Sequence, residues 1–123
     1  MANQKQLDLL RHGGMDTWMQ WRSSHANLPI DLDEADLHNG NLGGLDLSSA
    51  HLRGADLSKA DLNNANLSHT ILIDANLSGT NLADVNLSEA DLSGANLKDA
   101  DLNGANLNGT LITKDQLRQA RPL

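Results

Sequence analysis

Residues 90–109 read ADLSG-ANLKD-ADLNG-ANLNG, four copies of one five-residue pattern set end to end. The pattern continues beyond this stretch: Leu recurs at every fifth position from residue 32 to residue 107, 16 times in all, and Ile112 closes the series. Two positions before these 17 residues Ala stands ten times, and the position between holds Asp or Asn in 14 cases. Internal repetition at a fixed period predicts a stack of identical small units.

A period of five suits neither a helix nor a long strand. Five residues turn an α-helix by about 500°, so successive Leu residues would wander around its surface. In a long strand they would alternate between the two faces. A local interpretation fits better, in which the small residue, the polar residue and Leu form a short extended side and the next two residues turn a corner. The second corner position often holds a residue that tolerates positive φ, as in Gly94, Asp99 and Gly104.

These units resemble a known family. Residues 55–59 (ADLSK) and 95–99 (ANLKD) are similar to the A(D/N)Lxx motif of pentapeptide-repeat proteins, and 17 units run in register over residues 30–114. The resemblance implies an all-β solenoid, a right-handed quadrilateral parallel β-helix of about four coils with four repeats each. Coils of this kind rise by ~4.8 Å, one inter-strand spacing. Leu and Ala would fill the interior, and Asp and Asn would lie outside.

Both flanks are predicted to cap the open ends of the solenoid, which would otherwise expose unpaired backbone groups. In residues 1–29 apolar residues recur in a roughly helical pattern that Gly13-Gly14 interrupts, so we expect two short helices or one broken helix. Residues 14–22 (GMDTWMQWR) resemble a G-x-x-x-W-x-x-W-R stretch that precedes the repeats of some cyanobacterial members. We interpret its two Trp residues as cap packing, with an aromatic binding patch as the alternative.

The remaining boundaries follow from the end of the repeats. Residues 30–113 form the predicted repeat domain, and residues 114–123 a short capping helix. Thr113 and Gln116 fit the capping box that begins such a helix. Pro122 is expected to stop it.

Charge and composition narrow the function. The net charge is −7, and residues 30–114 hold 13 acidic and only four basic residues. This balance argues against ordinary nucleic-acid binding, which requires cations opposite the phosphates. The absence of Cys removes disulfides and thiolate metal sites. No signal peptide or transmembrane run is recognised, so a cytoplasmic protein without membrane contact is expected.

No catalytic constellation is present in the sequence. Nucleophile and phosphate-loop motifs are missing, and the histidines lack the short spacing of metal ligands. With 20 residues per coil, His51 would stack on Asp31, which suggests a solvated surface pair. We therefore expect no enzyme, no cofactor and no metal site. The five histidines are His12, His25, His38, His51 and His69.

One face departs from the repeat pattern. Residues 71–73 read Ile-Leu-Ile where the pattern asks for Asp or Asn before Leu72 and a polar residue after it. Two coils further, Leu111 also replaces the usual Asp or Asn. An exposed apolar cluster with a polar rim is typical of an interaction site. The alternatives are that single apolar surface residues are ordinary, and that the C-terminal helix covers Leu111. The candidate surface comprises Ile71, Ile73, Leu111, His51, Arg53 and Asp91.

These features predict a non-enzymatic protein–protein interaction module or rigid scaffold, a monomer or weak dimer whose partner is an unidentified protein. The alternative is an acidic DNA mimic that inhibits DNA gyrase, as the resemblance implies for some family members. Against mimicry, such members are long dimers that commonly carry Phe at the central position. This chain has no Phe and only about four coils. Separately, the predicted face with Asn41, Asp61, Asn81 and Asp101, plus Asp84, could dock a basic partner, and the alternative is a solvated face that keeps the rod soluble.

Overall fold

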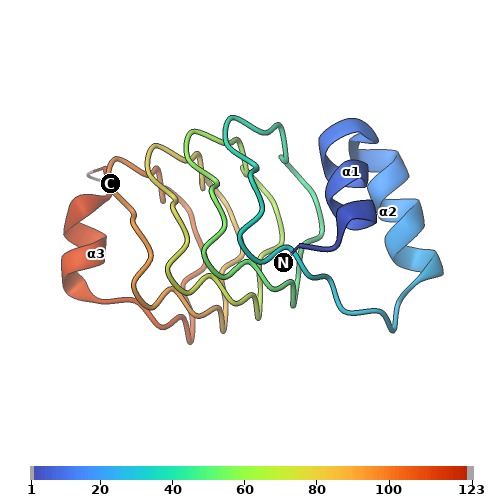
Figure 1. The fold of residues 1–123 in the computed structure, drawn as a ribbon. Coiled ribbons are helices and arrows are strands. Elements are labelled where there is room, and N and C mark those ends of the chain that lie inside the picture. Colours follow the sequence, from blue (N-terminus) through green and yellow to red (C-terminus); the bar gives the residue numbers. More distant parts are fainter. Residues whose placement is uncertain (1, 122–123) are drawn as a thin grey trace.

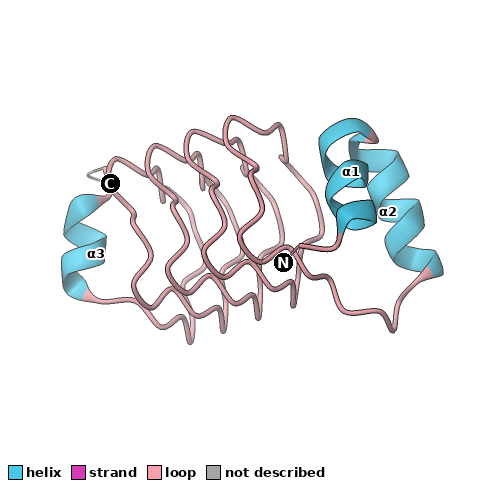
Figure 2. Ribbon diagram, in the orientation of Figure 1, coloured by secondary structure: helices cyan, strands magenta, loops and turns pink. Residues whose placement is uncertain are grey.

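The structure is a computed structural model that describes residues 2–121. Helices α1 (Gln4–His12) and α2 (Gly14–Ser24) come first, and helix α3 (Lys114–Gln119) comes last. Between them the chain winds as a stack of open coils, with α1 and α2 at one end and α3 at the other (Figures 1 and 2). In the part of the chain that the structure describes, no helix has the length and apolar character needed to cross a membrane.

Adjacent coils pair through parallel bridges between residues 20 apart, such as Asp36 with Asp56 and Asp56 with Asn76. This separation equals four five-residue units per coil. Every bridge between coils is isolated and no longer strand forms within residues 2–121, as expected for sides that are short extended segments. Each side supplies only about three extended residues before the next turn, so a continuous strand cannot develop.

The same set of main-chain hydrogen bonds repeats along the stack wherever a further coil follows. Leu57 donates its N–H to the Asn76 carbonyl at 2.8 Å, and Asn76 donates its own N–H to the Ala55 carbonyl at 2.9 Å. At the corner, Lys59 donates to the Ser78 carbonyl at 2.9 Å. This ladder satisfies the backbone polar groups that face the neighbouring coil, as a buried backbone requires.

The corners are β-turns whose third residue has a positive φ. Ala60 donates its N–H to the Leu57 carbonyl at 3.1 Å, and Lys59 between them has φ of 58°. For a residue with a Cβ, a positive φ costs about 1–2 kcal/mol. The sequence pattern therefore predicted a positive φ only at corners that hold Gly, Asn or Asp. The ladder bond from the corner N–H holds other residue types there as well. The unanticipated ones are Glu34, Ser49, Lys59, His69 and Glu89.

The interior is a column of Leu and small residues, as predicted. Every central Leu from Leu32 to Leu102 is at most 4% exposed, whereas Leu107 and Ile112 at the last coil are half-buried. Two buried hydroxyls find backbone acceptors: Thr70 donates to the Leu67 carbonyl and Thr80 to the Leu57 carbonyl, both at 2.7 Å. Within residues 2–121 the core is therefore narrow and regular, and its buried hydroxyls are all paired.

Acidic corner residues lie over a glycine of the next coil. A Cβ added to Gly94 would overlap the carboxylate of Asp74, and one added to Gly104 would overlap that of Asp84. The same arrangement places Glu89 over Gly109. The absence of a side chain at one corner thus makes room for an acid 20 residues earlier.

Helix α1 closes the first coil on one side. Asn3 donates its N–H to the Asp31 carbonyl at 2.7 Å. Gln6, only 1% exposed, donates its amide to the Pro29 carbonyl and accepts from the Asp31 N–H, both at 2.8 Å. The glutamine side chain thus pairs with the backbone edge in place of a preceding coil.

Helix α2 closes a second side. Trp18 is fully buried and its indole N–H donates to the Asp46 carbonyl at 2.9 Å. Arg22 donates to the same carbonyl at 3.0 Å and also to the carbonyl of Ser48. The interpretation of Trp18 as cap packing is confirmed by these contacts.

Helix α3 closes the last coil, and its predicted capping box is confirmed. Thr113 accepts the Gln116 N–H at 3.1 Å, and Gln116 accepts the Thr113 N–H at 2.8 Å. The Gln116 amide also donates to the carbonyls of Leu92, at 2.6 Å, and Ala95, at 3.1 Å. A buried glutamine therefore pairs with the backbone at each end of the stack. Pro122, expected to stop this helix, lies outside the described residues.

Substitution of Leu77 tests the register. Leu77→Ala should lower the free energy of unfolding by about 2–5 kcal/mol, because it leaves a cavity between packed coils. Ser78→Ala is the control, since Ser78 is half-buried and loses only the hydroxyl bond to Asn76, worth about 0.5–1.5 kcal/mol. Chemical denaturation measures both. Equal losses would contradict the placement of Leu77 in the interior.

Gln6 tests the N-terminal cap. Gln6→Ala leaves the Asp31 N–H and the Pro29 carbonyl without their partner and should destabilise the protein by about 1–3 kcal/mol. Gln4→Ala on the same helix is the matched control, because Gln4 is exposed and bonds only to the exposed Asp8. Thermal unfolding followed by circular dichroism compares the two. If both variants unfold at the same temperature, Gln6 does not hold the cap in place.

Candidate interaction face and carboxylate–histidine cluster

The structure brings most of the predicted interaction surface into one column. Parallel bridges join His51 to Ile71, Ile71 to Asp91, and Asp91 to Leu111. Ile73 lies two residues along from Ile71 and accepts the N–H of Gly54, the neighbour of Arg53. The four bridged residues, together with Ile73 and Arg53, are called the Ile71 face below.

The Ile71 face is less exposed than expected. Ile71 and Ile73 are half-buried, because the coils on either side flank them. Leu111 is 59% exposed, so helix α3 does not cover it. Asp91 stands between Ile71 and Leu111 in the column and separates the apolar side chains. The apolar surface is therefore a small isoleucine pair with a separate leucine at the end of the rod.

Polar groups border the isoleucine pair. Asp91 accepts from Ser93, at 3.0 Å from the N–H and at 2.6 Å from the hydroxyl. These two bonds are the main reason why the pKa of Asp91 lies below its usual value, and the Arg53 charge adds a smaller lowering. Opposite charges thus face each other across the coil that carries Ile71 and Ile73. Within residues 2–121, His51 forms no ion pair with Asp31.

The acidic column expected on another face is present but sparse. Bridges join Asn41 to Asp61, Asp61 to Asn81, and Asn81 to Asp101. Charged and neutral side chains alternate, so consecutive carboxylates of this column lie two coils apart. Asp61, Asn81 and Asp101 each accept the N–H of the residue two positions later through a side-chain oxygen, at 3.0 Å.

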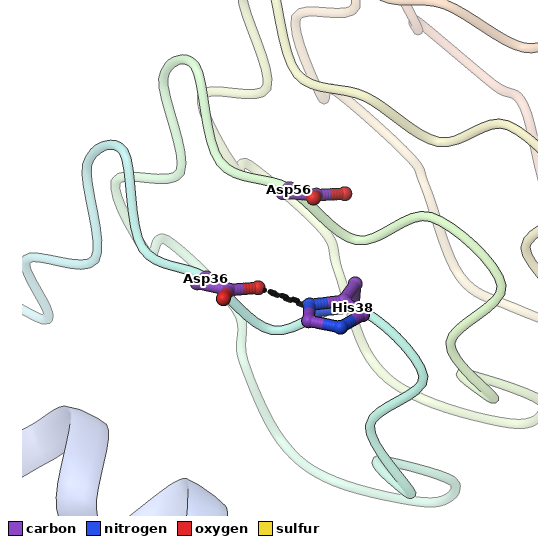
Figure 3. A group of neighbouring side chains, drawn as sticks. All are labelled: Asp36, His38 and Asp56. Carbon is purple, nitrogen blue, oxygen red and sulfur yellow. Dashed lines mark hydrogen bonds and ion pairs between the residues drawn. The ribbon is translucent and has the colours of Figure 1, made fainter.

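A second cluster joins Asp36, His38 and Asp56 (Figure 3). Asp36 and Asp56 are bridged neighbours in adjacent coils, and His38 lies two residues after Asp36. One potential ligand atom from each side chain lies within 4.8 Å of the others. This group was not predicted because the 20-residue register was applied to the columns of His51 and Asn41 but not to that of Asp36. The same register places Asp56 beside Asp36, so the signal was present in the sequence.

His38 occupies a position that serine holds in other repeats. After Asp56, for example, Ser58 donates its hydroxyl to the Asp56 carboxylate at 2.6 Å. At the equivalent place, the His38 N–H donates to the Asp36 carboxylate at 3.3 Å, and the ring Nδ1 bonds the same oxygen. The imidazole therefore replaces a hydroxyl in an otherwise conventional corner.

The hydrogen bond between Asp36 and His38 shifts the pKa values of both side chains. The side-chain bond, then the backbone bond from His38, holds the pKa of Asp36 below its usual 3.8. The bond to Asp36, and then its charge, raises the pKa of His38 above the usual 6.5. The stabilisation that the Asp36 carboxylate gives the folded protein is lost as the pH falls through the lowered pKa of Asp36. The stabilisation from the His38 imidazolium is lost as the pH rises through the raised pKa of His38. The ion pair is therefore strongest between these two pKa values.

The repeats of this chain match a known protein family. A family model described as pentapeptide repeats matches residues 30–68 and 70–109 in eight copies, well over half of the chain. The chain is a repeat solenoid and belongs to the pentapeptide-repeat family, which confirms the resemblance seen in its motifs. No curated protein sequence matches it.

Solved structures of the same family are similar to the chain. The pentapeptide repeat protein Rfr23 from the cyanobacterium Cyanothece 51142 is 40% identical over 72% of this chain and 63% of its own, with a TM-score of 0.47. A pentapeptide repeat protein from Nostoc PCC 7120 is 30% identical over 88% of this chain and 86% of its own, with a TM-score of 0.40. The chain thus spans less than two thirds of the length of the Cyanothece protein.

The Asp36–His38 pair predicts how the His38 ring titrates with pH. The His38 ring should titrate above the usual histidine value of 6.5 because the Asp36 carboxylate stabilises its charged form. In Asp36→Asn, which keeps an oxygen for the corner, the midpoint should move down. NMR titration of the His38 ring protons measures both. An identical midpoint in the two proteins would show that the pair does not form in solution.

Proposed function

We propose that this protein is a non-enzymatic interaction module that presents the Ile71 face to a protein partner. The observation that supports the proposal is the replacement of both polar positions around Leu72 by isoleucine. Asp or Asn in this position normally bonds its own corner, as Asp91 does, and Ile71 gives up that bond. Ile71 thus lacks a local hydrogen bond and presents a half-buried apolar side chain instead. This exchange supports a role for Ile71 in contact with a partner protein.

Rigidity supports the same proposal. Leu72 donates to the Asp91 carbonyl at 2.8 Å, and Ile71 donates to the Ala50 carbonyl at 3.1 Å, so both sides of the face are held by the ladder. Binding to a preformed surface avoids the entropy cost of ordering a loop. The shape we propose for the module is the right-handed, four-sided coil implied by the family motif. The 20-residue bridge period and one turn every five residues support it.

The distribution of charge favours the interaction module over the gyrase-inhibiting DNA mimic. Duplex DNA carries one charge per ~1.7 Å of its axis. On the column of Asn41, Asp61, Asn81 and Asp101 the carboxylates lie two coils apart, roughly 10 Å. The columns that begin at Asp36 and Asp46 end in neutral Asn residues. These columns of the described coils therefore lack the dense row of negative charge that mimicry of phosphates requires.

The paired change Ile71→Asn with Ile73→Ser tests the proposal. It restores the repeat pattern, so the fold should persist while partners captured from cells of the source organism are lost. Asn81→Asp with Ala83→Ser is the matched control, since it also installs pattern residues but on another face. Cross-linking followed by quantitative mass spectrometry compares the three proteins. If the isoleucine variant retains every partner and its oligomeric state, the Ile71 face has no binding role.

A further inference from the structure

We propose that Asp36, His38 and Asp56 form a surface site for a divalent transition-metal ion of the Zn²⁺ class. The site lies on the first two coils, away from the Ile71 face, and is independent of the proposed function. Its three side chains come from adjacent coils and meet on one side of the rod (Figure 3).

The backbone holds these side chains in register. Leu37 donates to the Asp56 carbonyl at 2.8 Å, and Asp56 donates to the Ala35 carbonyl at 2.9 Å. The ladder therefore fixes the two carboxylates in neighbouring coils. Zinc bonds to nitrogen and oxygen measure about 2.0–2.2 Å, so ligands around one ion lie roughly 3–4 Å apart. The potential ligand atoms lie within 4.8 Å of one another, and small side-chain rotations bring them to that separation.

The free atoms of the cluster suit a metal. Asp36 and Asp56 each use Oδ1 for the corner. Within residues 2–121, their Oδ2 atoms receive no hydrogen bond. The Arg11 guanidinium donates to the Asp36 carbonyl, at 2.6 Å, and not to its carboxylate. The acceptors needed for an ion are therefore present and not blocked by a neighbouring cation.

The donor set selects the class of ion. One imidazole nitrogen and two carboxylates favour Zn²⁺, Ni²⁺ or Cu²⁺, whereas Mg²⁺ and Ca²⁺ prefer a larger number of oxygen ligands. Two carboxylates also balance the charge of a divalent ion. The ion would displace the proton from the His38 ring nitrogen that binds it. Three protein ligands leave at least one position open to water.

Exposure and the nearby Arg11 charge limit the affinity. We expect a dissociation constant on the order of 10 µM, weaker than closed structural zinc sites and tighter than the millimolar sites made from oxygen ligands. The histidine is the ligand that distinguishes this corner from its serine-containing counterparts. Its replacement by serine should therefore weaken metal binding while keeping the corner.

Titration calorimetry of the full chain with ZnCl₂, and separately with MgCl₂, tests the site. The test variants are His38→Ser and Asp56→Asn, and the controls are His51→Asn and Asp61→Asn. All four changes introduce residues that the repeat itself uses, so each variant should fold. We expect one Zn²⁺ per chain, a loss of affinity of about ten-fold or more in both test variants, and no change in the controls.

Three results would overturn the proposal. One is the absence of saturable Zn²⁺ binding by the unaltered protein. Another is unchanged affinity in His38→Ser or in Asp56→Asn, which would place the ion elsewhere or reduce the site to fewer ligands. The third is equal affinity for Mg²⁺, which would indicate only attraction of any cation to an acidic surface.

Discussion

The structure depends on the hydrogen-bond ladder between coils. Each central Leu from Leu32 to Leu92 donates to a carbonyl in the next coil, as Leu57 does to Asn76, and these bonds stack each side of the rod on the side 20 residues earlier. Because the coil is only 20 residues around, the enclosed space is narrow. Leu and small residues fill it from Leu32 to Leu102, and the chain contains no Phe or Tyr.

The ladder must end somewhere, and the two ends are where individual side chains matter most. Gln6 and Gln116 use the same chemistry, since a carboxamide carries a donor and an acceptor in one plane like a peptide group. Each pairs with the backbone that a further coil would otherwise occupy. Helices α1 and α3 position these two carboxamides and cover the apolar layer of the end coils. Exposed coil edges, which favour association in β-proteins, are thereby reduced.

Sequence reasoning recovered the repeat, the Leu interior and the helical flanks because these depend on local periodicity. It did not recover the left-handed corners at Glu34 and Lys59, where the ladder overrides residue preference. It placed Ile71 and Ile73 on one face but overestimated their exposure, since burial depends on the coils on either side. The cluster at His38 was missed because contacts across coils require the 20-residue register to be applied to every residue. Cap contacts such as Trp18 with Asp46 depend on a helix orientation that periodicity does not encode.

The acid-over-glycine corners imply that this chain can change length only in large steps. Insertion or loss of a single five-residue unit would preserve each local turn but would move every later corner to a different side of the rod. If the change fell between residues 84 and 94, Asp74 would no longer face Gly94, nor Asp84 face Gly104, and the mismatched corners would place carboxylates against new Cβ atoms. A gain or loss of 20 residues keeps these partners aligned. Evolution of such rods by duplication should therefore proceed in whole coils, with the helical ends carried along unchanged.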